Sequence, residues 1–251
     1  MCLKFDDVPL TVAGRYSAAI LQKPTTVEVD ILKRNRALAH LKTKQFDAAL
    51  ADTKFPNFDS PPSEKALFRA AEALYHLRRF EQARQVLEKL TESFPSNTRA
   101  REMLERASDR CAEQTRADYN FRRLQAAARR CRPPTLDHAT YLGPVEVRQV
   151  AKKGQGLFVT KAVRAGELLI CEKAFSHAWV DEQESARSRM TVLLNIETGR
   201  GFAGGQSNLI TSTVQKLYRN PSLGDEFRDL FHGDYKSVDR STVDGQPIVD
   251  T

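Results

Sequence analysis

Cysteine is scarce in this chain of 251 residues, and its spacing argues against two kinds of site. The four cysteines form no C-x-x-C pair; they are Cys2, Cys111, Cys131 and Cys171. Structural zinc sites commonly use such pairs, and small secreted domains use dense, regularly spaced cysteines. The sequence therefore predicts neither a metal site nor a disulfide framework.

Long apolar runs are missing as well. No stretch approaches the roughly twenty apolar residues that a membrane helix needs. The N-terminal stretch carries Asp6 and Asp7 where a secretory signal would need an apolar run. We expect a soluble intracellular protein of the nucleus, the cytoplasm or both, without membrane binding.

Acidic residues are fewer than basic ones, 32 against 39, which gives a formal net charge of +7. This charge favours acidic partners, either proteins or nucleic acids, although a solvated basic surface explains it equally well. Hydrophobic residues make up 41% of the chain, enough for one large or two modest folded domains.

The first half of the chain repeats itself with a period of 34 residues. The matching pairs are Ala37 and Ala71, Phe46 and Phe80, and Ala49 and Ala83. This is the tetratricopeptide period, in which each unit is two antiparallel helices. Thr25 is expected to cap the first helix near Val27, and Pro56 to end the second helix of the first unit early.

A long charged helix is predicted after the second unit, from about Thr98 to Arg130. It carries a basic cluster near its end, formed by Arg122, Arg123, Arg129, Arg130 and Arg132. The cluster is either a phosphate-contacting patch or a solvated helix end, where cations suit the terminal carbonyls. The missing aromatic residues between the arginines favour the second interpretation.

A Gly-x-Gly motif organises the second half. The strand pattern of VEVRQV at 145–150 leads to Lys153-Gly154-Gln155-Gly156, and further strand patterns follow at Leu157–Thr160 and Leu168–Cys171. Two strands around such a turn form a hairpin whose backbone can approach another group closely.

The stretch KKGQGLFVTKAVRAGELLICEKAF resembles the opening hairpin of a SET domain, the fold of many protein lysine methyltransferases. The resemblance implies that Lys153, Gly154, Gln155 and Gly156 lie against S-adenosylmethionine. The run LYRNPSL…FHGDYKSV resembles the helical insert within SET domains of fungal proteins that also carry tetratricopeptide repeats.

The expected fold class is α+β, with a helical repeat array followed by an incomplete, mostly β SET-like domain. The predicted parts are an extension at 1–26, repeats with a terminal long helix at 27–132, a linker at 133–144, and the SET-like part at 145–251 with a helical insert at 207–231. Residues 181–206, which are polar and glycine-bearing, are expected to form a mobile loop.

The resemblance implies a second half of the SET domain with an Asn-His-Ser-type segment and a catalytic tyrosine, and no position of this sequence matches either. We therefore expect no catalytic residue here and no methyltransferase activity from the chain as given. His177 has no visible catalytic partner and is expected to serve packing or the surface.

The sequence leaves three functions open. The first is a SET-type methyltransferase, complete or truncated, whose repeats bind a protein. The second is a non-catalytic interaction module that binds an acidic or C-terminal peptide, with Lys33, Arg36 and Arg69 as candidate contacts. The third and weakest is nucleic-acid binding through the arginine cluster.

Overall fold

The computed structural model describes residues 12–58, 63–133, 135–151, 153–179, 192–194, 199–228, 242–243 and 246–247. Within them it mixes helices with small antiparallel sheets, which is compatible with the expected α+β class. The chain divides into two compact units, residues 1–104 with 210–251, and residues 105–209. No helix in the described part is both long and apolar enough to cross a membrane.

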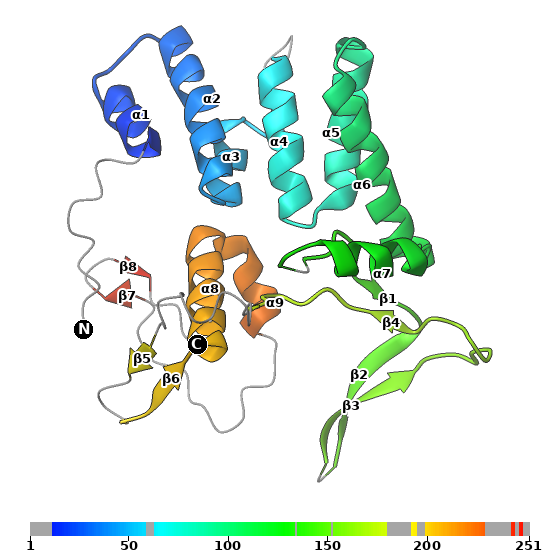
Figure 1. Cartoon of the computed structure of the whole chain (residues 1–251). Coiled ribbons are helices and arrows are strands. Elements are labelled where there is room, and N and C mark those ends of the chain that lie inside the picture. The colour runs from blue at the N-terminus through cyan, green and yellow to red at the C-terminus, as the bar shows by residue number, and fades with distance from the viewer. Residues whose placement is uncertain are drawn as a thin grey trace. The chain divides into compact units, whose positions relative to one another are not determined.

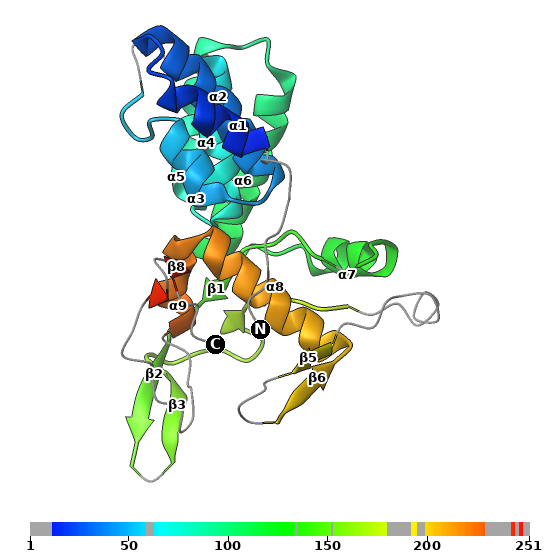
Figure 2. The ribbon, with the colours of Figure 1, turned by 90° about the vertical axis from the view of Figure 1, so that its left-hand side faces the viewer.

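The first unit is built from paired helices, which Figures 1 and 2 show packed side by side. Their bounds are α1 Val12–Leu21, α2 Thr26–Lys42, α3 Phe46–Asp52, α4 Glu64–His76, α5 Phe80–Ser93 and the first part of α6 Thr98–Arg116. The 34-residue repeat coincides with the pairs α2–α3 and α4–α5. The predicted start of α2 is confirmed, because Thr25 and Glu28 form a reciprocal capping box.

Small residues explain the period physically. Ala37 and Ala71 are fully buried, as are Ala49 and Ala83, so each pair of helices approaches closely at matching positions. Between them the core is filled mainly by the fully buried Leu67, Leu74, Leu87 and Leu90. The aromatic at the start of each second helix packs against α4: Phe46 stacks on His76, and Phe80 meets Tyr75 edge-on.

The first unit also contains a C-terminal stretch. The end of α8 Gly205–Arg219 leads into the short helices η1 Pro221–Leu223 and α9 Gly224–Arg228, and the strand pair β7 Thr242–Val243 and β8 Gln246–Pro247 follows. The expected end of a helix at Asn220-Pro221 is confirmed, although α8 begins earlier than the Asn208 cap predicted. Residues 229–231 of the predicted helical insert lie outside the described residues.

The second unit contains the end of α6, α7 Phe121–Arg130 and three strand pairs. The pairs join β1 Tyr141–Leu142 with β4 Ile170–Cys171, β2 Val145–Val150 with β3 Gly154–Val159, and β5 Val192–Leu194 with β6 Gly201–Ala203. The β5–β6 pair lies within the stretch expected to be a loop. Residues 181–191 and 195–198 of that stretch lie outside the described residues.

One predicted element is wrong: the long helix from Thr98 to Arg130 is two helices. α6 ends at Arg116, Ala117 takes a left-handed backbone conformation with φ of 59°, and α7 begins at Phe121. Asn120 caps the new helix, since its Oδ1 accepts a hydrogen bond from the Arg123 amide at 2.9 Å. Asparagine is a preferred N-cap residue, so the sequence did contain a signal for this break.

Candidate functional site

The predicted hairpin is confirmed as strands β2 and β3, but the turn lies earlier than expected. The pairing runs from Val145 opposite Val159 to Val150 opposite Gly154. Gly154, Gln155 and Gly156 are therefore strand residues, and of the four predicted site residues only Lys153 lies in the turn. The Lys153 amide closes that turn by donating a 3.0 Å hydrogen bond to the Val150 carbonyl.

Alternation along the strands places the predicted site residues on different faces. Gly154 and Gly156 lie on one face together with Phe158, whereas Gln155 belongs to the opposite face. The four predicted residues thus do not form one side-chain cluster. If a ligand lies on the glycine face, Gln155 contacts it only through its backbone.

The two glycines leave the backbone of β3 bare for different reasons. Gly154 has φ of +79°, a conformation that other residues rarely adopt. Gly156 has ordinary strand geometry, but a Cβ there would come within 3.0 Å of Cε2 of Phe158. Beside this bare stretch the Arg148 guanidinium lies over the Phe158 ring, 5.6 Å from its centroid, and pairs with Glu146.

The opposite face of the hairpin is apolar and exposed. Val147, Leu157 and Val159 are neighbours there, with exposed fractions of 63%, 53% and 48%. A two-stranded ribbon is only marginally stable alone in water, and apolar side chains on it gain from being covered.

The third apolar run forms β4, but β4 does not extend the hairpin. It pairs with β1, inside the stretch predicted as a linker, with Tyr141 opposite Cys171 and Leu142 opposite Ile170. Gly143 continues this pairing, because its amide donates to the Leu169 carbonyl at 2.8 Å.

Buried polar contacts tie this linker stretch to α6. Arg110 pairs with Glu113 at 2.6 Å and donates to the Asp137 carbonyl at 2.7 Å, while Glu113 accepts from the Ala139 amide at 2.8 Å. Tyr119 donates to the Ala139 carbonyl at 2.9 Å. Burial raises the pKa of Tyr119 well above its usual range, and the adjacent Cys171 acts in the same direction. The strands that follow are therefore anchored at their start.

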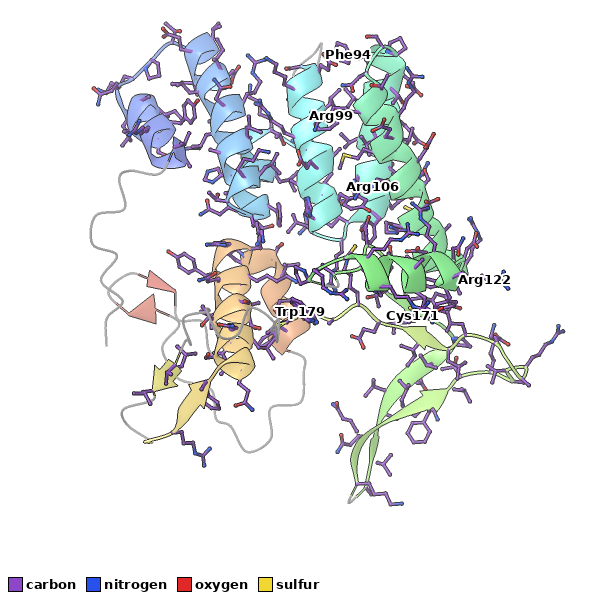
Figure 3. The ribbon with its side chains drawn as sticks, viewed as in Figure 1. Phe94, Arg99, Arg106, Arg122, Cys171 and Trp179 are labelled. Carbon is purple, nitrogen blue, oxygen red and sulfur yellow. The ribbon has the colours of Figure 1, made fainter. Side chains whose placement is uncertain are left out.

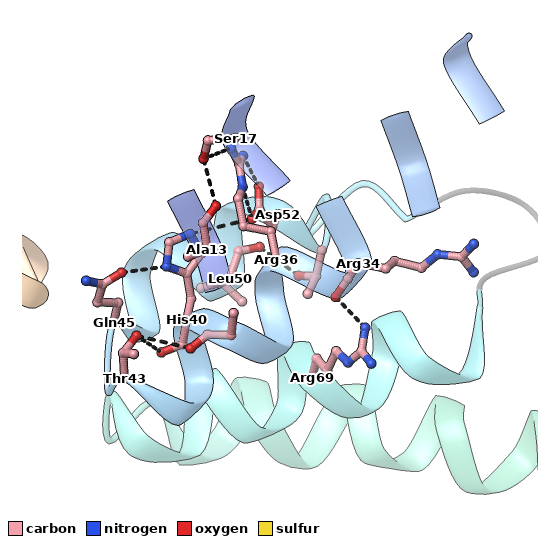
Figure 4. A network of polar contacts seen from close by, with 12 residues as sticks. Ala13, Ser17, Arg34, Arg36, His40, Thr43, Gln45, Leu50, Asp52 and Arg69 are labelled. Atoms are coloured by element: carbon pink, nitrogen blue, oxygen red, sulfur yellow. Dashed lines mark hydrogen bonds and ion pairs between the residues drawn. The ribbon is translucent and has the colours of Figure 1, made fainter. Parts of the chain in front are cut away.

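The three candidate peptide contacts on the repeats have different surroundings, and Figure 4 shows those of Arg36 and Arg69. Arg36 binds both oxygens of the buried Asp52 at 2.6 and 2.8 Å, and this contact raises the pKa of Arg36. Arg69 donates to the Arg34 carbonyl, and burial, followed by the charge of Arg34, lowers the pKa of Arg69. Arg36 and Arg69 thus have structural roles.

Lys33 lines a cavity of about 220 Å³ beside α2. Its other lining residues include Arg34, Lys54, Asp30 and Phe58. Lys54 pairs with Asp30 at 2.9 Å, whereas Lys33 has no hydrogen bond or ion pair with any residue that the structure describes. Of the three candidates, Lys33 is the one free to meet a ligand.

His177 is exposed, as expected for a surface residue. Among the described residues no group of three or more histidine, cysteine, aspartate or glutamate side chains is arranged to hold a metal ion.

Comparison with known proteins gives one informative match. The chain is 39% identical over 236 residues to a Gibberella zeae protein named "Methyltransferase", and the match covers 94% of this chain and 32% of that relative. The chain thus spans about a third of the length of the relative it matches. No model of a known protein family matches the chain, and no solved structure matches it.

Proposed function

We propose that this chain is part of an S-adenosylmethionine-dependent protein lysine methyltransferase of the SET type, with tetratricopeptide repeats that bind a protein. The observation that carries the proposal is the bare glycine face of β3, within a chain 39% identical over most of its length to a protein named methyltransferase. The SET-like assignment rests on the resemblance of the hairpin sequence to that family.

The proposed cofactor position is the face of β3 that carries Gly154 and Gly156. At Gly154 a ligand can lie directly on the open backbone, beside the Phe158 ring that lies over Gly156. Lys153, at the adjacent turn, is exposed and can approach the carboxylate of S-adenosylmethionine. Such a site supplies binding and orientation; in-line methyl transfer to a lysine amine also requires a water-excluding channel. We propose that this channel is built by residues other than those of the hairpin.

The test is calorimetric titration of the chain with S-adenosylmethionine, comparing Gly156→Ala with Gly201→Ala. An alanine at either position meets one flexible side chain at 3.0 Å, Phe158 in the first case and Leu194 in the second. The two substitutions should therefore have a similar steric cost in the folded chain. We expect Gly156→Ala to weaken binding by roughly tenfold or more, because the added methyl group pushes the Phe158 ring into the space of the cofactor, and Gly201→Ala to leave it unchanged.

Circular dichroism of each variant checks that the fold is retained. Equal binding by both variants would reject the glycine face as the cofactor site. A folded parent chain that binds no S-adenosylmethionine would reject cofactor binding by this part of the protein.

A second candidate function is a non-catalytic interaction module, favoured by the free Lys33 at the cavity beside α2. The probe is an acidic peptide with a free C-terminal carboxylate, compared with the same peptide amidated. We expect the free acid to bind more tightly and Lys33→Gln to remove that difference, since one charge-assisted hydrogen bond is lost. Identical affinities for both peptides would exclude a carboxylate contact there.

A further inference from the structure

Helix α7 carries positive charge at the end where a helix least favours it. Because α6 ends at Arg116, Arg122 and Arg123 lie in the first turn of α7, not near the end of a long helix. The N-terminus of a helix has partial positive charge, and the first turn of α7 contains no acidic residue. The solvated helix end that the sequence favoured does not explain these two arginines.

Four arginines of α7 form one exposed stripe. Arg122 and Arg129 are seven residues apart, as are Arg123 and Arg130, so each pair lies on one side about two turns apart. All four are exposed, and none of their guanidinium groups has a hydrogen bond or ion pair with any residue that the structure describes. No acidic residue occurs from 119 to 136.

Aromatic rings flank the stripe at both ends. Phe121, 53% exposed, stacks on Tyr119 at the start of α7. At the other end Arg132 closes the helix by donating to its last carbonyls and lies 6.0 Å from the centroid of the Trp179 ring, which is 37% exposed. Figure 3 shows Arg122 and Trp179 toward opposite ends of α7. No aromatic residue lies between the arginines in the sequence, but Phe121 directly precedes them and the fold brings Trp179 to the other end.

We infer that this surface, made of the arginine stripe with Phe121 and Trp179, binds single-stranded nucleic acid. Arginine suits phosphate because its planar fork can donate two hydrogen bonds at once. Exposed aromatic rings suit unpaired bases, since every base has a face that stacks.

The side of α7 next to the stripe argues against a membrane as the partner. Leu124 and Ala127 line a cavity of about 390 Å³ together with Arg123 and residues of α6, so this side faces protein. The apolar side chains of α7 are also few and small, namely Phe121, Leu124 and three alanines, whereas membrane-surface helices bury a large apolar face. An acidic peptide would match the arginines but would leave the two exposed rings without a role.

The experiment measures binding of a fluorescent oligothymidylate of about a dozen nucleotides, a length that covers one single-strand site. We expect binding to fall with added salt with a logarithmic slope of about −3, the value for four phosphate contacts on a single strand. Changing the four stripe arginines to glutamine should reduce affinity on the order of 100-fold. The chain has one tryptophan, so quenching of its fluorescence reports base stacking on Trp179 directly.

A matched control removes four exposed cations elsewhere, with Arg15, Arg101, Lys161 and Arg164 all changed to glutamine. It should change affinity by less than about threefold, since only net charge is altered. The double variant Arg122→Gln/Arg123→Gln should lose affinity while its thermal midpoint stays equal or rises, because it relieves the repulsion at the start of α7.

Three results would overturn the inference. The first is an equal loss in both quadruple variants, and the second is unquenched tryptophan at saturating oligonucleotide. The third is a glutamate-rich peptide or anionic vesicles binding more tightly than the oligonucleotide.

Discussion

Replacing Asp52 with alanine is expected to lower the free energy of unfolding of the first unit by on the order of 3 kcal/mol. Asp52 ends α3, its side chain is 6% exposed, and both of its oxygens accept hydrogen bonds from Arg36 of α2. Arg36 also donates to Ser17 of α1 at 2.9 Å, so one guanidinium joins three helices (Figure 4). Removing the carboxylate leaves that largely buried cation without its counterion.

His40 lies near the same carboxylate but is too far away for a hydrogen bond. Its Nε2 lies 3.8 Å from Oδ2 of Asp52, and its Nδ1 contacts Oε1 of Gln45 at 2.5 Å. Without Asp52, Arg36 of α2 loses its partner on α3. Arg36 also holds Ser17 of α1, so the contact between α1 and α2 then depends on a guanidinium without its counterion.

Asp30→Ala is the matched control. It also removes an aspartate carboxylate from an ion pair of the first unit, here the pair of Asp30 with Lys54. Both side chains of this pair are more than a third exposed. Exposed pairs contribute between zero and about 1 kcal/mol. Urea unfolding followed by far-ultraviolet circular dichroism compares the two variants. Equal midpoints would show that the Arg36–Asp52 pair contributes no more than a surface pair.

A double-mutant cycle separates the pair from its surroundings. If Arg36 is destabilising mainly because it is unpaired, Arg36→Met in the Asp52→Ala background should recover part of the lost stability. Additive losses would contradict the pairing as the source of the effect.

Much of the repeat region was predictable because its determinants are local and periodic. Ala37, Ala71, Ala49 and Ala83 are buried at matching positions, so the 34-residue period reports packing directly. The start of α2 followed from Thr25, whose capping contacts extend over only three residues.

Elements that depend on distant contacts were not predictable. The sequence of α1 shows no clear period, and its Ser17 is engaged by Arg36 from α2. Strand β1 was read as linker because it has two residues and its partner, β4, lies about thirty residues later in the chain. Neither the contact of Ser17 with Arg36 nor the pairing of β1 with β4 can be detected in a short window of sequence.

The candidate site was predictable in its position but not in its geometry. Glycine spacing located the hairpin, yet the local sequence fits the predicted turn at Lys152 to Gly156 as well as the shorter turn between Val150 and Gly154. The register, set by Val150 opposite Gly154, decides which residues share a face, and it separates Gln155 from the glycines. The surface around α7 also needed the fold, since Trp179 is 47 residues from Arg132 in the sequence.

Asn220→Ala should also destabilise the first unit by on the order of 3 kcal/mol. Helix α3 has no capping side chain of its own, because Gln45 makes no side-chain cap hydrogen bond. Asn220, 174 residues later, supplies one: its Oδ1 accepts from the Phe46 amide at 2.6 Å and, more weakly, from the Asp47 amide at 3.4 Å. Its Nδ2 donates to the carbonyls of Lys44 and Lys216 at 3.0 and 3.2 Å.

The Asn220 side chain therefore fastens the end of α8 to the first repeat, and it is only 2% exposed. Ser222 reinforces the contact, since its amide and hydroxyl donate to the two oxygens of Asp47 at 2.9 and 2.7 Å. Removing the carboxamide leaves backbone groups of the first repeat and of α8 without a hydrogen-bond partner at the same time. A cap that acts within one segment leaves groups of that segment alone unpaired.

Asn97→Ala provides the comparison, because the Asn97 side chain caps α6 through one bond to the Ala100 amide at 2.9 Å and, among the described residues, otherwise makes only an exposed hydrogen bond to Glu64 at 2.9 Å. We expect a loss of about 1 kcal/mol there. Hydrogen exchange distinguishes the two cases. The amides of Phe46 and Asp47 should exchange faster in Asn220→Ala than in the parent chain, and their exchange rates should be unchanged in Asn97→Ala. Protection of both amides in Asn220→Ala would mean that α3 is capped without the C-terminal stretch. Faster exchange of these two amides in Asn220→Ala would show that the start of α3 depends on residues 216–222 for its protection. A repeat domain that ends before α8 would then lose part of its stability.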